Sequence, residues 1–195
     1  HRVDRRQRQM CIRDRIKYNN MACTLTAGRA LPCKKSVGGL KAIYFADFDS
    51  LGVLTGGVDG SDITAIAGLN IWYKYDIKGS SSLETSITSS NEAGTTFYTQ
   101  TLNLVLTVLD SATQAEIAIL AVSRPHVAVE DYNGNVFLVG LENGADTTGG
   151  SILTGASMGD ASSCNLTLVA NERNAPNFVT EALSLSASAQ IDPNA

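Results

Sequence analysis

The stretch Thr96-Phe97-Tyr98-Thr99-Gln100-Thr101-Leu102-Asn103-Leu104-Val105-Leu106-Thr107-Val108-Leu109 decides the fold class of this chain. Its residues alternate between apolar and polar over most of its length, which is the period of a β-strand with one buried face. One face carries Tyr98, Leu102, Leu104, Leu106 and Val108, and the other carries Thr99, Thr101, Asn103 and Thr107. The run is much longer than the usual strand of about five or six residues. It predicts a long strand with an apolar side that covers a core.

A partner for this strand precedes it in the sequence. Leu83 to Thr88 also alternates, and Ser89-Ser90-Asn91-Glu92-Ala93-Gly94, between the two runs, has the composition of a turn. The two runs together predict a long hairpin with one apolar face and one polar face.

Further strands are expected on both sides of this hairpin, where Ile, Val, Tyr and Phe gather between turn residues. They are expected at Leu40 to Phe48, Leu69 to Ile77, His126 to Tyr132, Val136 to Leu141 and Cys164 to Ala170, with a short last strand within Pro176 to Leu183. The pair Asn133-Gly134 tolerates positive φ and predicts a hairpin turn. The Gly-rich stretches Asp49 to Asp62 and Asn143 to Asp160 are expected to be connections.

One helix is expected after the long hairpin. Ser111-Ala112-Thr113-Gln114 has the spacing of a capping box, with Ser111 as the capping residue. The helix is expected over Ala112 to Ser123, because Pro125 disfavours helical geometry at Arg124. The fold class predicted from these elements is mainly β, a β-sandwich or a partly open barrel, with one flanking α-helix.

Charge divides the chain at residue 20. The net charge is −4, and residues 1–20 hold seven basic and two acidic residues, so they carry +5 and the rest carries −9. We expect three parts: a basic extension over 1–20 that is non-native or disordered, a β domain over 21–183, and a flexible tail or docking arm over 184–195.

The basic extension has two interpretations. The string Arg8-Gln9-Met10-Cys11-Ile12-Arg13-Asp14-Arg15 resembles translated sequencing-adapter read-through, as found at the ends of metagenome-assembled reading frames, and Met21 would then be the true start. The alternative is a real basic arm that serves in targeting or nucleic-acid binding.

The composition of the rest excludes several classes of protein. Residues 21–195 contain eight basic and 17 acidic residues, which argues against a basic nucleic-acid binder. No apolar run approaches the roughly 18 residues of a membrane-spanning helix. Charged residues are only about one in seven, whereas Ser and Thr number 35. This charge-poor surface suits a protomer with close subunit contacts, and an extracellular all-β domain has a similar composition.

No candidate for catalysis or metal binding is complete. Gly155-Ala156-Ser157-Met158-Gly159 matches the nucleophile elbow, but the strand before it, the helix after it and a later His are not predicted. His126 and Glu130 could share a strand face, yet two ligands do not make a zinc site, so a partly exposed strand His is expected. Asp47 with Asp49, and Asp59 with Asp62, lack the spacing of a calcium loop. We therefore expect no enzyme, no cofactor and no metal.

The cysteines leave two alternatives open. Cys23 and Cys33 flank a Pro-containing turn and are close enough in sequence to form a disulfide, while two reduced thiols fit equally well. Asn165-Leu166-Thr167 matches the glycosylation pattern, but it lies inside a predicted strand.

The long hairpin belongs to a region without basic residues. No Lys or Arg occurs in the 45 residues between Lys78 and Arg124, although that region has four acidic residues. A surface that holds DNA gains affinity from Lys and Arg, because each phosphate contact releases counterions. Neutral Thr and Asn with scattered acids would instead form a wall past which DNA can slide. A simple solvated sheet would have the same pattern.

A succession of short motifs resembles the tail-tube proteins of tailed bacteriophages, particularly crAss-like and related phages. The N-terminal motifs are Met-Ala-Cys-Thr-Leu-Thr from Met21, Val37-Gly38-Gly39 before Ile43-Tyr44-Phe45, and Gly94-Thr95-Thr96-Phe97. The C-terminal motifs include Val129-Glu130-Asp131-Tyr132-Asn133-Gly134, Phe137-Leu138-Val139-Gly140 and Leu166-Thr167-Leu168. The resemblance covers about Met21 to Leu183.

This resemblance implies a β-sandwich with a flanking helix, assembled as six copies per ring, with rings stacked into a hollow virion tail tube that conducts DNA. Thr99, Thr101, Asn103 and Thr107 would then face the lumen or a subunit seam. One alternative is the same fold in an extracellular tubular appendage or the inner tube of an injection system. Another is a capsid-decoration or carbohydrate-binding β module.

Overall fold

The computed structural model of the protein describes residues 27–31, 33–48, 50–57, 61–67, 71–77, 80–180 and 186–187. The chain divides into two units, His1–Lys35 and Ser36–Ala195. In the first unit the described residues are exposed and form neither helix nor strand. The basic extension over 1–20 lies outside the described residues.

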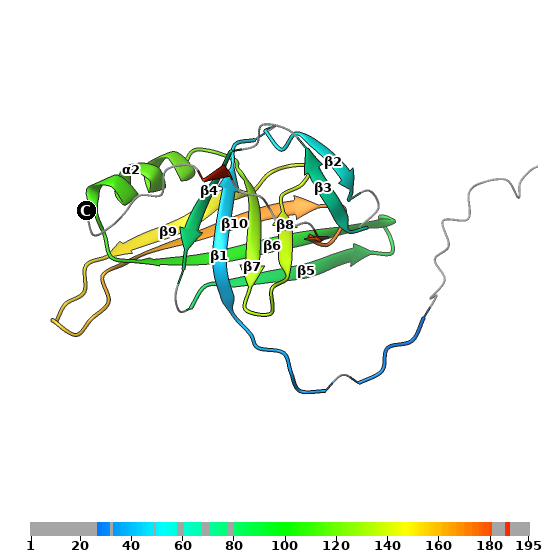
Figure 1. The fold of residues 1–195 in the computed structure, drawn as a ribbon, viewed down its shortest axis with the longest axis horizontal. Coiled ribbons are helices and arrows are strands. Elements are labelled where there is room, and N and C mark those ends of the chain that lie inside the picture. Colours follow the sequence, from blue (N-terminus) through cyan, green and yellow to red (C-terminus); the bar gives the residue numbers. More distant parts are fainter. Residues whose placement is uncertain are drawn as a thin grey trace, which may run out of the picture. The chain divides into compact units, whose positions relative to one another are not determined.

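The second unit contains two β-sheets and one helix among its described residues (Figure 1). The larger sheet consists of β1 (Leu40–Ala46), β2 (Val53–Gly56), β3 (Ile63–Ala67), β4 (Ile71–Asp76), β7 (His126–Asp131), β8 (Val136–Val139), β11 (Asn177–Val179) and β12 (Ser186–Ala187). The smaller sheet consists of β5 (Ser82–Ser90), β6 (Thr95–Thr107), β9 (Asp146–Leu153) and β10 (Ser163–Glu172), and the helix is α2 (Ser111–Leu120).

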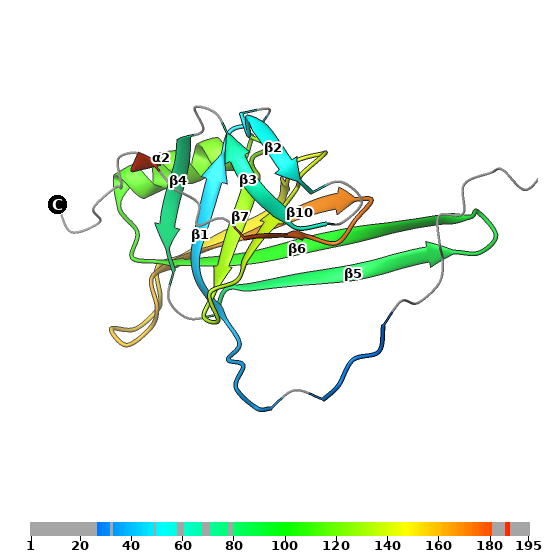
Figure 2. The ribbon, with the colours of Figure 1, turned by 45° about the vertical axis from the view of Figure 1, so that its right-hand side comes forward.

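The order of the strands is β12-β4-β1-β7-β8-β11-β3-β2 in the larger sheet and β5-β6-β10-β9 in the smaller. All pairs in the smaller sheet are antiparallel. Figure 2 shows the strands of the smaller sheet crossing β1 and β7 steeply. Within the described residues, the predicted fold class, mainly β in a sandwich with one flanking helix, is confirmed.

The core lies between the two sheets. The long strand β6 contributes Leu102, Leu104 and Leu106, which pack with Ile43 of β1 and Val127 of β7. The helix closes one end of this cluster with its two buried residues, Ile117 and Leu120. A second cluster on the other side of the larger sheet includes Tyr44, Ile63 and Trp72. Strand β1 is therefore buried on both faces except at Lys41.

The long hairpin forms as predicted, with one correction at its end. Leu102 and Leu104 are fully buried and Leu106 nearly so, which confirms the predicted register of the apolar face. Val108 was expected on the same face, but it is 55% exposed and has a φ of 69°. A β-branched residue with positive φ cannot continue a strand, so β6 ends at Thr107.

The helix begins and ends differently from the prediction. Asp110, rather than Ser111, is the capping residue, because its Oδ1 accepts a hydrogen bond of 3.0 Å from the backbone N–H of Thr113. Hydrogen bonding by the side chain of Thr113 first, and by its backbone N–H second, lowers the pKa of Asp110. The helix ends at Leu120 instead of Ser123, and the Thr147 hydroxyl donates to the Leu120 carbonyl at 2.9 Å. The hydroxyl of Thr147 in β9 thus satisfies a carbonyl at the C-terminus of the helix. The local sequence alone does not define this end of the helix.

Three strands were missed within and beside the Gly-rich stretches. Strands β2 and β3 follow Leu51, and β9 lies where only a connection was expected. Gly150 in β9 fits because a Cβ there would lie 2.9 Å from the carbonyl oxygen of Asn165 in β10. The glycines that weaken the strand pattern in the sequence therefore allow the close approach of neighbouring backbones.

The turn between β7 and β8 confirms the hairpin predicted from Asn133-Gly134, with Gly134 at a φ of 82°. Asp131 accepts hydrogen bonds from the backbone N–H groups and side-chain amides of Asn133 and Asn135, at 2.8 to 3.0 Å. Burial raises the pKa of Asp131, but these bonds outweigh that effect and hold the pKa below its usual value.

We expect Asp131→Ala to lower the free energy of unfolding by about 1 kcal/mol at neutral pH. Because the folded pKa is depressed, the carboxylate's contribution is complete above its unfolded pKa of about 3.9 and is lost as the pH falls through the lower folded value. Urea unfolding at pH 7 and pH 3 should therefore show the difference from wild type shrinking in acid. Asp47→Ala, which alters an exposed acid after β1, is the control, and an equal loss in both variants would contradict the prediction.

Candidate assembly surface

The elbow-like sequence Gly155 to Gly159 forms the turn between β9 and β10. The Asp160 carboxylate accepts hydrogen bonds from the backbone N–H groups of Ala156 and Ser157, at 2.9 and 2.8 Å. A strand, β9, does precede the turn, contrary to the prediction, but β10 follows it where a nucleophile elbow needs a helix. The segment is a capped turn, as expected.

His126 and Glu130 do not form a metal site together. His126 was expected to be partly exposed, but it is buried, its Nδ1 lies 2.6 Å from the Gly140 carbonyl, and its ring stacks on Phe48. Burial is due to β7 lying in the middle of the larger sheet.

Glu130 instead accepts hydrogen bonds from Lys41 and from the hydroxyl of Tyr44, the latter at 2.8 Å. Burial pushes the pKa of Glu130 upward, but the two donors outweigh it and keep that pKa below its usual value.

Metal ligands do not gather in the part of the chain that the structure describes, since no group of three His, Cys, Asp or Glu residues there could hold an ion. Asp47 and Asp62 are separate loop residues, and Asp49 and Asp59 lie outside the described residues. Cys33 is exposed and Cys23 lies outside the described residues, so the pairing of these two cysteines stays a prediction. Burial raises the pKa of the Cys164 thiol.

The smaller sheet has a polar face on the side opposite its buried leucines. Thr99, Thr101 and Asn103 are half-buried and Thr107 is exposed, all on the side of β6 opposite its leucines. The register places Ser82, Glu84 and Ser86 of β5 and Asn165, Thr167, Val169 and Asn171 of β10 on the same side. We call this surface the outer face.

Hydrogen bonds between strands hold the outer face together. The Thr99 hydroxyl donates to Oδ1 of Asn171 at 2.9 Å, and the Thr167 hydroxyl donates to Oδ1 of Asn103 at 3.1 Å. Because these donors and acceptors satisfy each other, the face needs no charged group to order it. The sequence correctly separated the polar side of β6, but it did not show that β10 completes the face.

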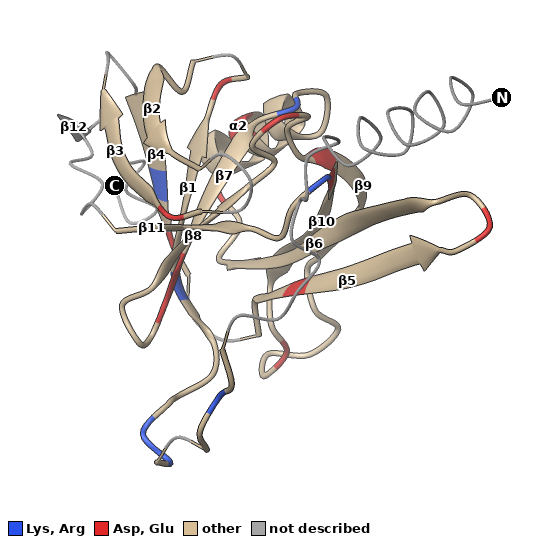
Figure 3. Ribbon diagram, turned by 90° about the vertical axis from the view of Figure 1, so that its right-hand side faces the viewer, with Lys and Arg blue, Asp and Glu red and all other residues tan. Residues whose placement is uncertain are grey.

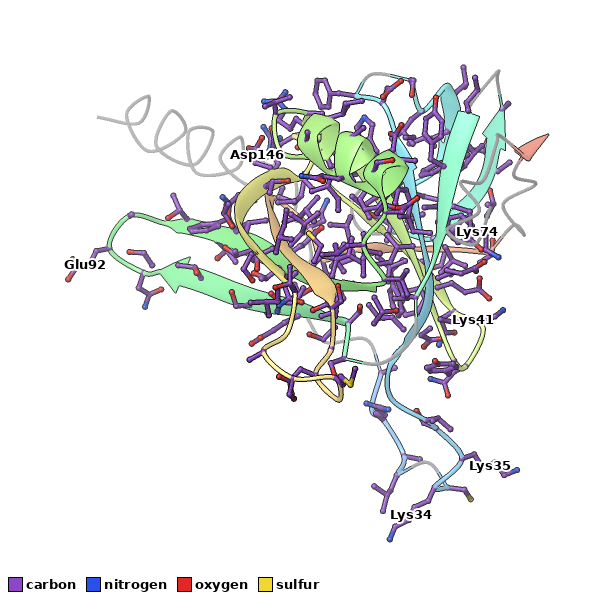
Figure 4. All side chains as sticks on the ribbon, turned by 90° about the vertical axis from the view of Figure 1, so that its left-hand side faces the viewer. Lys34, Lys35, Lys41, Lys74, Glu92 and Asp146 are labelled. Carbon is purple, nitrogen blue, oxygen red and sulfur yellow. The ribbon has the colours of Figure 1, made fainter. Side chains whose placement is uncertain are left out.

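The outer face carries no positive charge. Lys and Arg are absent from β5, β6, β9 and β10, and Figure 3 shows these strands without blue. In Figure 4, Lys41 and Lys74 lie on the larger sheet, whereas Glu92 lies at the tip of the hairpin. Glu172, at the end of β10, is buried on the core side, where it accepts hydrogen bonds from the N–H groups of Glu142 and Asn143. Burial raises the pKa of Glu172.

Both edges of the smaller sheet are open, since β5 pairs only with β6 and β9 only with β10 among the described residues. Exposed apolar side chains lie on both edges: Ile87 of β5 is 64% exposed, and Ile152 and Leu153 of β9 are 52% and 49% exposed. Neither edge strand contains Lys or Pro, the residues that commonly block pairing with another chain. Sequence reasoning missed the β9 edge, because its glycines indicated a connection.

An apolar groove runs beside the β5 edge. It has a volume of about 420 Å³, and its lining includes Leu83 and Thr85 of β5, Phe137 of β8 and Phe178 of β11. The rings of Phe137 and Phe178 are in contact, with centroids 4.7 Å apart. The groove therefore lies on the core side of the β5 edge. A strand added to this edge would place every second side chain in the groove.

Comparison with known proteins gives no relative: no family model, no curated protein and no solved structure matches the chain. Within the described residues, no helix is long and apolar enough to cross a membrane.

Proposed function

We propose that this chain is a structural protomer that assembles with copies of itself into a hollow tube for the passage of DNA, as in the tail tube of a tailed bacteriophage. The observation that carries this proposal is the smaller sheet, which combines two open edges with an outer face that has no Lys or Arg. The edges offer a means of assembly, and the face offers a wall that does not bind DNA.

The topology of the smaller sheet favours a closed ring. Its strands alternate in direction, so β5 and β9 run antiparallel to each other. A copy that is rotated, but not turned over, therefore brings its β9 antiparallel to the β5 of its neighbour, with both outer faces on the same side. Such a head-to-tail contact uses two different surfaces and closes into a ring when the rotation allows.

Six copies per ring, the number that the family resemblance implies, give a barrel of suitable size. With four strands per copy, a strand spacing of about 4.8 Å and a tilt of about 40°, the barrel would be about 50 Å across between backbones. This width would admit a DNA duplex. The outer face would line the lumen, and the larger sheet would lie outside it.

The chemistry of the outer face fits passage better than binding. Thr99 and Thr167 donate hydrogen bonds to Asn171 and Asn103 within the face. Glu84 is the charged side chain among the residues that define it. Without Lys or Arg there is no counterion release on contact with DNA. DNA in such a tube would move along the wall without adhering to it.

Thr101→Lys should impair DNA passage while leaving assembly intact. The Thr101 side chain is half-buried on the outer face, away from both edges. Because every copy would carry the new positive charge, the wall of the tube would offer many contacts to DNA phosphates. We expect infectivity of a phage carrying this variant to fall at least about tenfold with normal tail length. Thr101→Gln adds similar bulk without charge and is the control. Equal infectivity of the Lys variant and wild type would contradict the conduit.

Assembly itself is tested with protein that starts at Met21. Light scattering and electron microscopy should show rings or tubes, and a protein that stays monomeric at high concentration would instead favour a decoration or carbohydrate-binding module. Microscopy of native particles separates the two kinds of tube: tubes on DNA-filled heads support a phage tail, and long tubes without heads support an appendage or injection system.

A further inference from the structure

The apolar groove beside β5 and the exposed Ile152 of β9 belong to the same side of the smaller sheet, although they lie on its two opposite edges. Ile152 is opposite Cys164, which is buried in the core. Leu83 is opposite the buried Leu102, and Leu83 and Thr85 line the groove. Because register partners share a face of a sheet, Ile152 and the groove are both on the core side.

This common side limits how β9 can pair with the β5 edge of a second copy. When two copies form one continuous sheet with their outer faces on the same side, a core-side residue must lie opposite a core-side residue. The first three core-side residues of β5 are Leu83, Thr85 and Ile87. Ile152 can therefore lie opposite one of these residues, but not opposite the outer-face residues between them.

The tilt of the strands in a closed barrel narrows the choice. Ile152 is level with Cys164 and Leu106 across the sheet. Leu106 lies four positions beyond Leu102, the partner of Leu83. Pairing of Ile152 with Leu83 of the next copy therefore displaces the strands by four residues for each copy. With a rise of about 3.4 Å per residue and four strand spacings of about 4.8 Å, the tilt is about 35°, within the usual range of about 35–45°.

The next positions along β5 fit less well. Pairing at Thr85 gives a tilt of about 47°, and pairing still further along makes the tilt steeper. Pairing at Thr85 also places the apolar Leu153 opposite Glu84 on the outer face. Pairing at Leu83 instead places Ser151 opposite Glu84, so that two polar side chains face each other.

The displacement has the hand that a barrel requires. In Figure 1, where the larger sheet lies in front of the smaller, β6 runs to the left with β10 above it and β5 below it. With β6 turned upward, β10, β9 and then the next copy follow to its right. Because β5 runs downward, a displacement of four residues along it makes the strands rise to the right around a ring whose outer faces line the lumen. This is the right-handed coil that follows from the twist of β-strands.

We propose that Ile152 of one copy lies opposite Leu83 of the next and occupies the groove beside it, so that each copy completes the site of its neighbour. The groove of about 420 Å³ has Phe137 and Phe178 in its wall, and Phe178 is 46% exposed in the single chain. Contact removes these apolar side chains from water and adds to the backbone bonds of the strand pair. This register rests on the ring contact proposed above, and it adds the residue that aligns the copies.

The variants Ile152→Ala and Leu153→Ala test the groove contact. The two residues are neighbours in β9 and are 52% and 49% exposed, but only Ile152 faces the groove. We expect Ile152→Ala to raise the concentration needed for ring formation at least about tenfold, and Leu153→Ala at most about twofold. Light scattering over a dilution series measures both values. Equal effects of the two substitutions would overturn the assignment of Ile152 to the groove.

Cysteine pairs on the outer face test the register, since neither position enters the groove. We use protein that starts at Met21 and has its first two cysteines replaced by Ser. Glu84→Cys with Ser151→Cys brings two thiols of neighbouring copies directly opposite each other. Ser86→Cys with Ser151→Cys is the matched control, because it places the two Cα atoms diagonally, about 8 Å apart, beyond the reach of a disulfide.

We expect air oxidation to join copies of the Glu84 variant into a covalent ladder that ends at ring size, at least about tenfold faster than the control. Equal or faster linking in the Ser86 control, in rings that form normally, would overturn the register and leave the ring contact standing. Absence of rings from protein without substitutions in β5 and β9 would overturn both proposals.

Discussion

Ile152→Lys will abolish the formation of rings and tubes while the protein stays folded. Ile152 lies on the open β9 edge and is half exposed in the single chain, so the lysine reaches water there and unfolding is affected by only about 1 kcal/mol. Between β9 and the β5 of a neighbour, the ammonium group would be taken out of water without a partner. A cost of about 3 kcal/mol or more raises the concentration needed for assembly by at least about 100-fold.

Light scattering and negative-stain microscopy measure this result. Met158→Lys is the matched control, because Met158 is fully exposed in the turn between β9 and β10 and belongs to neither edge strand. The control should assemble as wild type does. Normal assembly of Ile152→Lys would show that the β9 edge is not an assembly surface.

A mixing experiment tests whether the contact is head to tail. Ile87→Lys should block the β5 edge in the same way, since Ile87 is exposed on that strand. Each variant alone should be monomeric. Mixed, the intact β9 of the Ile87 variant can pair with the intact β5 of the Ile152 variant, and the pair cannot grow further. We therefore expect a dimer from the mixture, and either larger species or no association would contradict a β5-to-β9 contact.

Leu102→Ala will destabilise the fold strongly, and Thr101→Ala will not. The two residues are neighbours in β6, but Leu102 is fully buried in the core and Thr101 is half-buried on the outer face. Loss of a buried leucine side chain leaves a cavity and costs about 2–5 kcal/mol, whereas we expect about 0.5 kcal/mol for the threonine.

Urea unfolding in the Ile152→Lys background measures both values without a contribution from assembly. The pair tests the register on which the outer face depends, because a shift of one residue would exchange the two faces of β6. Equal losses in the two variants would show that the faces are not assigned correctly.

The sequence predicted the elements whose local pattern agrees with their surroundings in the fold. Strand β6, the β7–β8 hairpin and the helix were all expected, because alternation, Asn-Gly and a terminating proline act within a few residues. Their ends were less predictable: Asp110 caps the helix instead of Ser111, and Val108 leaves β6 although it continues the apolar pattern. Ends depend on contacts with distant residues, such as the bond from Thr147 to Leu120.

The sequence predicted one part of the candidate assembly surface, the polar face of β6, but not the β9 edge. Thr99, Thr101, Asn103 and Thr107 were assigned to a common polar face and lie on it. The β9 edge was missed because Gly149 and Gly150 suppress the strand pattern, yet β10 holds this segment through its backbone. His126 was expected to be partly exposed in its strand, but the order of strands in the larger sheet buries it.

The sequence by itself determined that the chain is poor in charge, mainly β with one predicted helix, and has a long hairpin free of basic residues. Charge depends on composition, and the elements depend on the period of neighbouring side chains, so both follow from the sequence. Only the tertiary structure decided which strands became edges. Strand order joins segments far apart in the chain, as when β10 inserts between β6 and β9, and pairing of that kind depends on backbone hydrogen bonds that every residue except proline can make. For that reason the two open edges, from which assembly is proposed, could not be read from local patterns.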